Sequence, residues 1–172
     1  MITLCGLAPV FAADARVLVL GSFPGERSLA AQQYYAHPQN RFWPTMGTAC
    51  GFDARAPYAE RLDALRTCGV ALWDVLGACV RVGSLDSAIV LGSETANDFG
   101  TLFERCAGIR GVLFNGQKAK QSFARHVVPE EFWEGSGLAF VTLPSTSPAH
   151  AVMRRDELAQ RWREALEALT LD

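Results

Sequence analysis

The chain has 172 residues, of which 49% are hydrophobic and 20% are charged. This composition excludes a disordered or low-complexity chain, and the length favours one domain, which we expect to span residues 1–172. The formal net charge is −2 and no basic tail is present, so any contact with nucleic acid must come from a local patch of the surface.

The cysteines favour no metal centre and no disulfide framework. Their number is odd, and none falls in a CxxC motif or at a zinc-binding distance from a histidine: Cys5, Cys50, Cys68, Cys79 and Cys106. We therefore expect no metal and no cofactor, and free thiols favour the reducing cytoplasm. The N-terminus lacks the positive start of a signal peptide, and no apolar run approaches the ~20 residues that span a bilayer. We expect a cytoplasmic monomer with no membrane contact.

Hydrophobic patterns predict strands and helices that alternate along the chain. Short apolar runs bounded by turn residues predict buried strands at residues 17–20, 70–76, 111–114 and 138–143. Helical spacing, with Pro or Gly near the ends, predicts helices at residues 44–50, 58–68, 95–106, 117–126 and 156–169. After Gly25 the chain is too broken for a helix and too aromatic for an ordinary surface loop, and residues 81–89 show a mixed pattern.

This alternation predicts an α/β fold with three αβα layers and a short, mainly parallel four-stranded sheet between helices. In a parallel sheet the carboxyl ends of all strands lie at one edge, and ligands bind there. Four polar stretches follow or end the predicted strands: the loop from Gly21, Asp74, Asn115, and residues 144–150. We therefore expect these stretches to converge on one cleft.

Three kinds of chemistry are compatible with such a cleft. Gly21–Gly25 could bind phosphate, but it has neither P-loop nor dinucleotide-fold glycine spacing. A hydrolase triad of Ser, Asp74 and His150 would lack the G-x-S-x-G elbow. A base-flipping DNA glycosylase requires a backbone cradle, an aromatic platform for the base, an amide, and a second loop that contacts phosphate. The chain has a candidate for each part.

Three stretches resemble the uracil-DNA glycosylase superfamily: Gly21-Ser22-Phe23-Pro24-Gly25, then Tyr35-Ala36-His37-Pro38-Gln39-Asn40-Arg41-Phe42-Trp43, then Leu143-Pro144-Ser145-Thr146-Ser147-Pro148-Ala149-His150. Within it, they are similar to the mismatch-specific uracil/thymine-DNA glycosylases and closer to the hypoxanthine (deoxyinosine) DNA glycosylases. The resemblance covers roughly residues 16–169 and implies a short parallel sheet between helices.

The resemblance also implies roles for individual residues. Gly21, Ser22, Phe23, Pro24 and Gly25 match the first motif, Gly-x-Asn-Pro-Gly, whose Asn positions the attacking water in many members. Phe23 replaces that Asn here, so water activation by this position is impossible. Asn40 is the remaining asparagine in this stretch, and the hypoxanthine branch is similar in relying on it. Tyr35 matches the aromatic residue that stacks on the flipped base.

The second motif is matched by residues 143–150. There Ser145 and Ser147 are the predicted substrate contacts, with Ser147 on phosphate, Ala149 stands where a bulkier wedge often sits, and His150 follows it. Asp74 could cap a helix or could contact the base edge or a water. Asn115, which precedes a glycine, could mark a turn or contact the base. We predict Asn40, Asp74 and His150 as catalytic residues.

The predicted function is that of a monofunctional DNA glycosylase acting on double- or single-stranded DNA. It would excise a deaminated base, hypoxanthine first, with uracil and xanthine as alternatives, by base flipping and hydrolysis of the N-glycosidic bond. A non-catalytic nucleotide- or DNA-binding α/β module, without the chemistry of the missing Asn, is the alternative. In a prokaryotic cell either protein would be found with the nucleoid.

Overall fold

The structure is a computed structural model that describes residues 2–171. Its strands are β1 (Thr3–Cys5), β2 (Val17–Gly21), β3 (Val70–Asp74), β4 (Leu76–Val80), β5 (Thr95–Ala96), β6 (Gly111–Asn115) and β7 (Ala139–Leu143). Its α-helices are α1 (Glu26–Ala31), α2 (Phe42–Cys50), α3 (Tyr58–Thr67), α4 (Phe99–Arg105), α5 (Gln117–His126) and α6 (Arg155–Thr170). Within the described part, no helix is long and apolar enough to cross a membrane.

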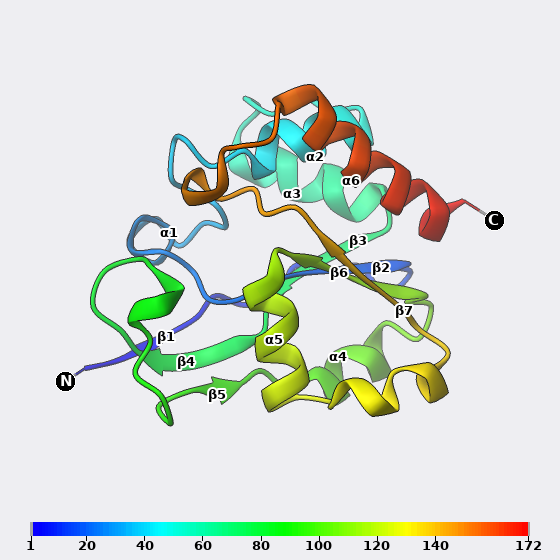
Figure 1. Ribbon diagram of the computed structural model, residues 1–172. Coiled ribbons are helices and arrows are strands. Elements are labelled where there is room, and N and C mark those ends of the chain that lie inside the picture. Colours follow the sequence, from blue (N-terminus) through cyan, green and yellow to red (C-terminus); the bar gives the residue numbers. More distant parts are fainter. Residues whose placement is uncertain (1, 172) are drawn as a thin grey trace.

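A four-stranded parallel sheet in the order β3-β2-β6-β7 forms the middle layer. Helices α2, α3 and α6 cover one face, and α4 and α5 cover the other (Figure 1). β2 is buried along its whole length because it has a neighbour on each side and a helical layer on each face. The predicted αβα architecture with a parallel four-stranded sheet is therefore confirmed.

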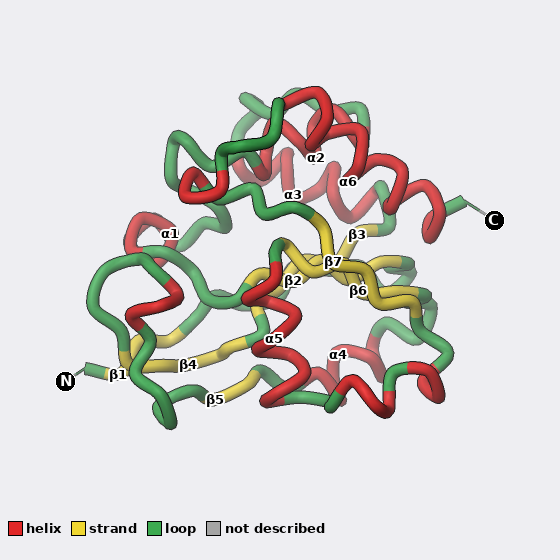
Figure 2. The backbone as a smooth tube through the Cα atoms, viewed as in Figure 1, coloured by secondary structure: helices red, strands yellow, loops and turns green. Residues whose placement is uncertain are grey.

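A second, antiparallel sheet in the order β1-β4-β5 lies beside the first and was not predicted (Figure 2). The predicted strand at residues 70–76 is in fact two strands. The chain leaves the parallel sheet at Val75, whose N–H donates to the Gly21 carbonyl at 2.9 Å, and then enters the small sheet as β4. One continuous apolar run thus serves two sheets, which periodicity alone cannot reveal.

Two further predictions about helices were wrong. Residues 95–96 form β5, and α4 begins only at Phe99, because the Asp98 side chain accepts from the Thr101 N–H at 3.0 Å and caps the helix there. The stretch after Gly25 does contain a short helix, α1, which ends at Gln32 in the left-handed conformation. α5 has the predicted bounds, and Phe42 and Trp43 are core aromatics, 0% and 5% exposed.

Candidate active site

The carboxyl ends of β2, β3 and β6 open into a cavity of about 320 Å³. Every residue predicted for the site lines it except His150: Asn40, Asp74, Gly21, Ser22, Phe23, Pro24, Gly25, Tyr35, Asn115, Ser145, Ser147 and Ala149. A volume of this size is in the range of small-molecule sites. The predicted convergence of four separate stretches on one cleft is therefore present in the fold, while the roles of the residues remain predictions.

The first loop, Gly21–Gly25, lines the cavity and passes very close to Asp74 and Tyr35 at Gly21. A Cβ atom at Gly21 would collide with the Asp74 carboxylate and come within 2.9 Å of the Tyr35 hydroxyl, so only glycine fits. The Phe23 side chain is 6% exposed, and the Arg81 guanidinium lies 5.0 Å from its ring centroid. Phe23 therefore brings no hydrogen-bonding side-chain atom to the loop.

Asn40 is held in one orientation by its side-chain oxygen. Oδ1 accepts from the Phe42 N–H at 2.9 Å and from the Thr146 hydroxyl at 3.0 Å. Both lone pairs of Oδ1 are then used. Among the described residues no acceptor contacts Nδ2, so the two N–H groups of Asn40 are what this residue offers to the cavity.

Asn115, by contrast, is almost fully used in holding the site together. Its Nδ2 donates to the Tyr35 hydroxyl at 3.1 Å and to Thr146 Oγ1 at 2.9 Å, and its Oδ1 accepts from the Thr146 N–H at 2.9 Å. Thr146 is completely buried and connects both amides. The sequence comparison passed over Thr146, although it lies between two residues of the second motif that were selected.

Tyr35 combines an unusual backbone with a stacked ring. It is one of two non-glycine residues with positive φ among those described, at 53°, and its ring stacks on Phe42 with centroids 4.0 Å apart. Burial, reinforced by the Asp74 charge, raises the pKa of its hydroxyl far above the ordinary range, so this group stays protonated. The strained backbone is typical of functional sites and fixes the ring against the cavity.

Asp74 ends β3, and no helix follows it, so the capping interpretation is wrong. The side chain is 4% exposed, and Oδ2 is buried without a hydrogen-bond partner. Burial, and after it the negative charge of Asp86, raise the pKa of the carboxyl to about 7, while Arg81 opposes the shift. Near neutral pH a substantial fraction of Asp74 is therefore an uncharged acid that both donates and accepts.

One wall of the cavity comes from the segment between β4 and β5, which the sequence did not single out. Asp86 accepts from the Ser22 hydroxyl at 2.6 Å, and the Ser84 hydroxyl accepts from the Glu26 N–H at 2.9 Å. Arg81, which is 5% exposed, donates to the Pro24 carbonyl at 2.5 Å. The mixed pattern of residues 81–89 carried no signal for this role, because each contact joins residues more than fifty positions apart.

The second motif forms another part of the cavity wall. Ser147 caps a single 3₁₀ turn, Pro148–His150, and its hydroxyl accepts from the Ala149 N–H at 3.3 Å. Ala149 and His150 are exposed, and His150 lies outside the cavity, in an adjoining groove of about 1130 Å³ that Lys118 and Arg161 also line. Between residues 2 and 171 there is no group of three His, Cys, Asp or Glu side chains that could hold a metal ion.

Comparison with known proteins identifies the family. The sequence model of the uracil DNA glycosylase superfamily matches residues 8–170. A hypoxanthine DNA glycosylase of Methanosarcina acetivorans is 37% identical over 146 residues, covering 84% of this chain and 87% of the relative. One of Methanosarcina barkeri is 39% identical over 115 residues, covering 66% and 72%.

A solved structure agrees with both sequence comparisons. The solution NMR structure of a candidate uracil DNA glycosylase from Methanosarcina acetivorans superposes with a TM-score of 0.77 at 34% identity, covering 96% of this chain and 99% of that one. The resemblance that the three motifs carried is therefore confirmed by sequence and by fold. The chain belongs to the uracil DNA glycosylase superfamily.

Proposed function

We propose that the chain, residues 1–172, acts as one monofunctional DNA glycosylase domain that removes hypoxanthine from deoxyinosine in DNA. The family and the two hypoxanthine DNA glycosylases among its relatives support the class of enzyme. Uracil and xanthine are weaker candidates. The reaction is hydrolysis of the N-glycosidic bond after the nucleotide has been flipped out of the duplex into the cavity.

The observation that carries this proposal is the fixed orientation of Asn40. With Oδ1 occupied by Phe42 and Thr146, the side chain presents only donors to a bound base. Deamination replaces an exocyclic amine, which donates, with a carbonyl, which accepts. A fixed donor therefore favours a deaminated base over adenine or cytosine, and it stabilises the negative charge that builds up on the base as the bond breaks.

Asp74 complements this donor. In its protonated form the carboxyl offers one O–H donor and one carbonyl acceptor, and its buried Oδ2 has no hydrogen-bond partner within the protein. Hypoxanthine carries a matching pair at the edge of its six-membered ring, the N1–H donor and the O6 acceptor. Tyr35, already stacked on Phe42, supplies the aromatic surface beside the base.

The adjoining groove supports a path for the DNA strand. Ser84, Leu85, Asp86, Asn115, Ser145, Ser147 and Ala149 line both the cavity and the groove. Lys118 and Arg161 line the groove and not the cavity. Cationic side chains at such positions can contact the phosphates of a DNA strand. We assign His150 to this outer surface rather than to the reacting bond, because it is exposed and lies outside the cavity.

A single-turnover assay tests the proposal directly. Enzyme in excess is mixed with labelled duplexes that differ only in one base, which is hypoxanthine, uracil, xanthine, adenine or guanine, and abasic sites are revealed with alkali. We expect the fastest excision from the hypoxanthine duplex and none from the adenine duplex. Binding of the hypoxanthine duplex without excision of any base would instead support the non-catalytic module.

A further inference from the structure

We infer that Asp86 is the catalytic carboxylate of this site and takes a proton from the water that attacks the sugar. The inference rests on the proposed function and adds a residue that lies outside all three motifs. Position 23 cannot orient a water, because the Phe23 side chain has no polar atom and is buried under Arg81. The water therefore requires a partner from another part of the cavity.

The depth at which each residue lies separates the candidates. Asn40, Asp74 and Tyr35 line only the inner cavity, while Asp86 lines both the cavity and the groove. A flipped nucleotide has its base inside and its phosphates in the groove, so its sugar must pass this junction. Asp86 is the one described Asp or Glu that lines both spaces, which places its carboxylate beside the atom where positive charge develops.

The Asp86 side chain is held with one oxygen free. Oδ2 accepts from the Ser22 hydroxyl at 2.6 Å, which fixes the rotamer and uses the hydroxyl proton. No donor contacts Oδ1 in the part of the chain that the structure describes. A carboxylate with one oxygen anchored and the other open can accept a hydrogen bond from a water. Asp74 lies deeper, and burial raises the pKa of its carboxyl to about 7.

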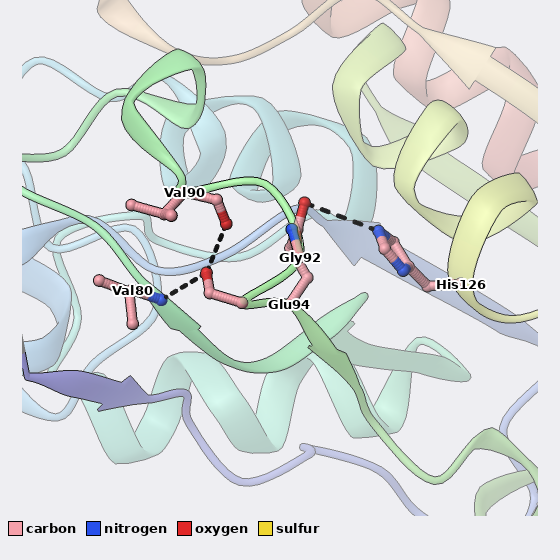
Figure 3. A network of polar contacts seen from close by, with 6 residues as sticks. Val80, Val90, Gly92, Glu94 and His126 are labelled. Atoms are coloured by element: carbon pink, nitrogen blue, oxygen red, sulfur yellow. Dashed lines mark hydrogen bonds and ion pairs between the residues drawn. The ribbon is translucent and has the colours of Figure 1, made fainter.

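The segment that carries Asp86 is anchored at both ends. Arg81 donates to the Pro24 carbonyl at its start, so the segment is tied to the first motif. At its end, Ser93 Oγ accepts from the Val80 N–H at 2.9 Å and donates to the Val90 carbonyl at 2.6 Å (Figure 3). Glu94 lies 3.9 Å from His126 at the end of α5 (Figure 3). These contacts meet the requirement that a catalytic group be held by rigid neighbours.

The step balances in protons and electrons. The C1′–N9 bond breaks and its electron pair leaves with the purine, which takes a proton from the neutral Asp74 carboxyl. The water oxygen forms the new bond to C1′, and one of its protons passes to the Asp86 carboxylate. The products are the free base and an abasic sugar, and the two carboxyl groups regain their starting states by exchange with solvent.

Asp86→Asn tests the inference in the full-length protein. The amide keeps the shape and can still accept from Ser22, but it cannot take a proton. We expect the single-turnover rate on the hypoxanthine duplex to fall by about 10²-fold or more, the range for loss of a general base. Affinity for a duplex with non-cleavable 2′-fluoro-2′-deoxyinosine should change by less than about threefold. In the surface control Asp63→Asn, both the single-turnover rate and this affinity should change by less than about threefold.

Chemical rescue separates catalysis from folding. Asp86→Ala should regain activity when sodium formate is added, because formate returns a carboxylate to the vacated space, while Asn40→Ala should not respond. A wild-type-like rate in Asp86→Asn, an affinity loss as large as the rate loss, or absence of formate rescue would each overturn the role of Asp86. Failure of the wild type on every deaminated base would overturn the proposed function as well, so the two failures are distinguishable.

Discussion

The two sides of the cavity are built on different physical principles. Asn40, Asn115 and Thr146 form a neutral network in which both amide oxygens and the Asn115 amide nitrogen have partners within the protein, and the Asn40 amide nitrogen faces the cavity. Asp74, Asp86 and Arg81 form a charged group in which Asp74 Oδ2 and two Arg81 nitrogens are buried without partners. A hydrogen-bonded network fixes positions, whereas a buried charged cluster with unpartnered atoms responds to pH. Substitutions in the neutral network should therefore lower the excision rate at every pH, whereas the effect of the charged group should depend on pH.

The sharpest way to break the neutral side is Asn40→Ala. It removes the fixed donors and leaves the Phe42 N–H and Thr146 hydroxyl without their acceptor. We expect the single-turnover rate to fall about 10²–10³-fold, the range for losing one preorganised donor. Gln39→Ala, at the exposed neighbouring position, is the matched control and should excise hypoxanthine at the wild-type rate. Near wild-type excision by Asn40→Ala would remove Asn40 from the mechanism.

Asp74→Asn probes the charged side through pH. Burial raises the pKa of Asp74 to about 7 in the folded state, against an ordinary value near 4 when unfolded. Between these values the unfolded chain loses the proton while the folded one keeps it, so this group makes the protein less stable as pH rises from about 4 to about 7. Urea unfolding at pH 4.5 and pH 8 measures this decline in the free energy of unfolding. The decline should be about 2–3 kcal/mol smaller in Asp74→Asn than in the wild type.

The groups facing Asp74 are Asp86, Arg81, Tyr34 and Tyr35, so other titrations contribute to each profile. The difference between wild type and Asp74→Asn isolates the one carboxyl. Glu104→Gln, an exposed position on α4, should follow the wild-type profile. An unchanged slope in Asp74→Asn would contradict the burial argument. Excision by the wild type should also weaken above pH 7 as Asp74 ionises, and the Asn variant should lose this decline.

Two substitutions of Tyr35 separate the contribution of its aromatic ring from that of its hydroxyl group. Tyr35→Ala removes the stacking surface, which is worth about 1–3 kcal/mol per base, and should weaken binding of the non-cleavable inosine duplex accordingly. Tyr35→Phe keeps the ring and frees only the Asn115 amide, which retains Thr146 as a partner. We expect the Phe variant to keep most of the affinity and activity. Equal damage in both variants would show that the hydroxyl is the essential group.

The smallest effect concerns the lysines beside the groove. Lys118 is exposed and lines the groove, whereas Lys120 pairs with Glu130 at 3.1 Å. We expect Lys118→Ala to lower DNA affinity a few-fold at low salt and less at high salt, as for one lost phosphate contact. Lys120→Ala is the matched control, with little change. Borohydride should trap no protein–DNA adduct in the wild type, and a trapped adduct lost in either variant would make the enzyme bifunctional.

The sequence predicted the parallel sheet and its cleft because both depend on local patterns. Buried strands such as β2 and β6 read as short apolar runs, and each ends at a turn residue that the chain also displays locally. Twelve of the thirteen predicted site residues follow from that placement together with the motifs. The antiparallel sheet was missed because β1 and β5 have only three and two residues, too short for a periodic signal.

The contributions of Thr146 and Asp86 could not be predicted from the sequence, for two different reasons. Thr146 lies within a motif, and only its central position in the hydrogen-bond network separates it from the neighbouring serines. Asp86 depends on a contact with Ser22, 64 residues away, which requires the β4–β5 segment to lie against the first loop. Pairings of this kind come from tertiary packing, and a single sequence holds no periodicity that reports them.

The register between β2 and β3 has a consequence for how this chain can change length. Gly21 is the ladder partner of Asp74, and Leu20 that of Phe114, the residue before Asn115. Side chains alternate between the two faces of a sheet along each strand. Deleting one residue inside β2 would therefore move the side chains before the deletion to the opposite face, or would replace Gly21 with a residue whose Cβ collides with Asp74. Insertions between α2 and α3 carry no such penalty, because that connection meets neither strand end. Length variation among homologues should therefore concentrate there and spare the strands that end at the cavity.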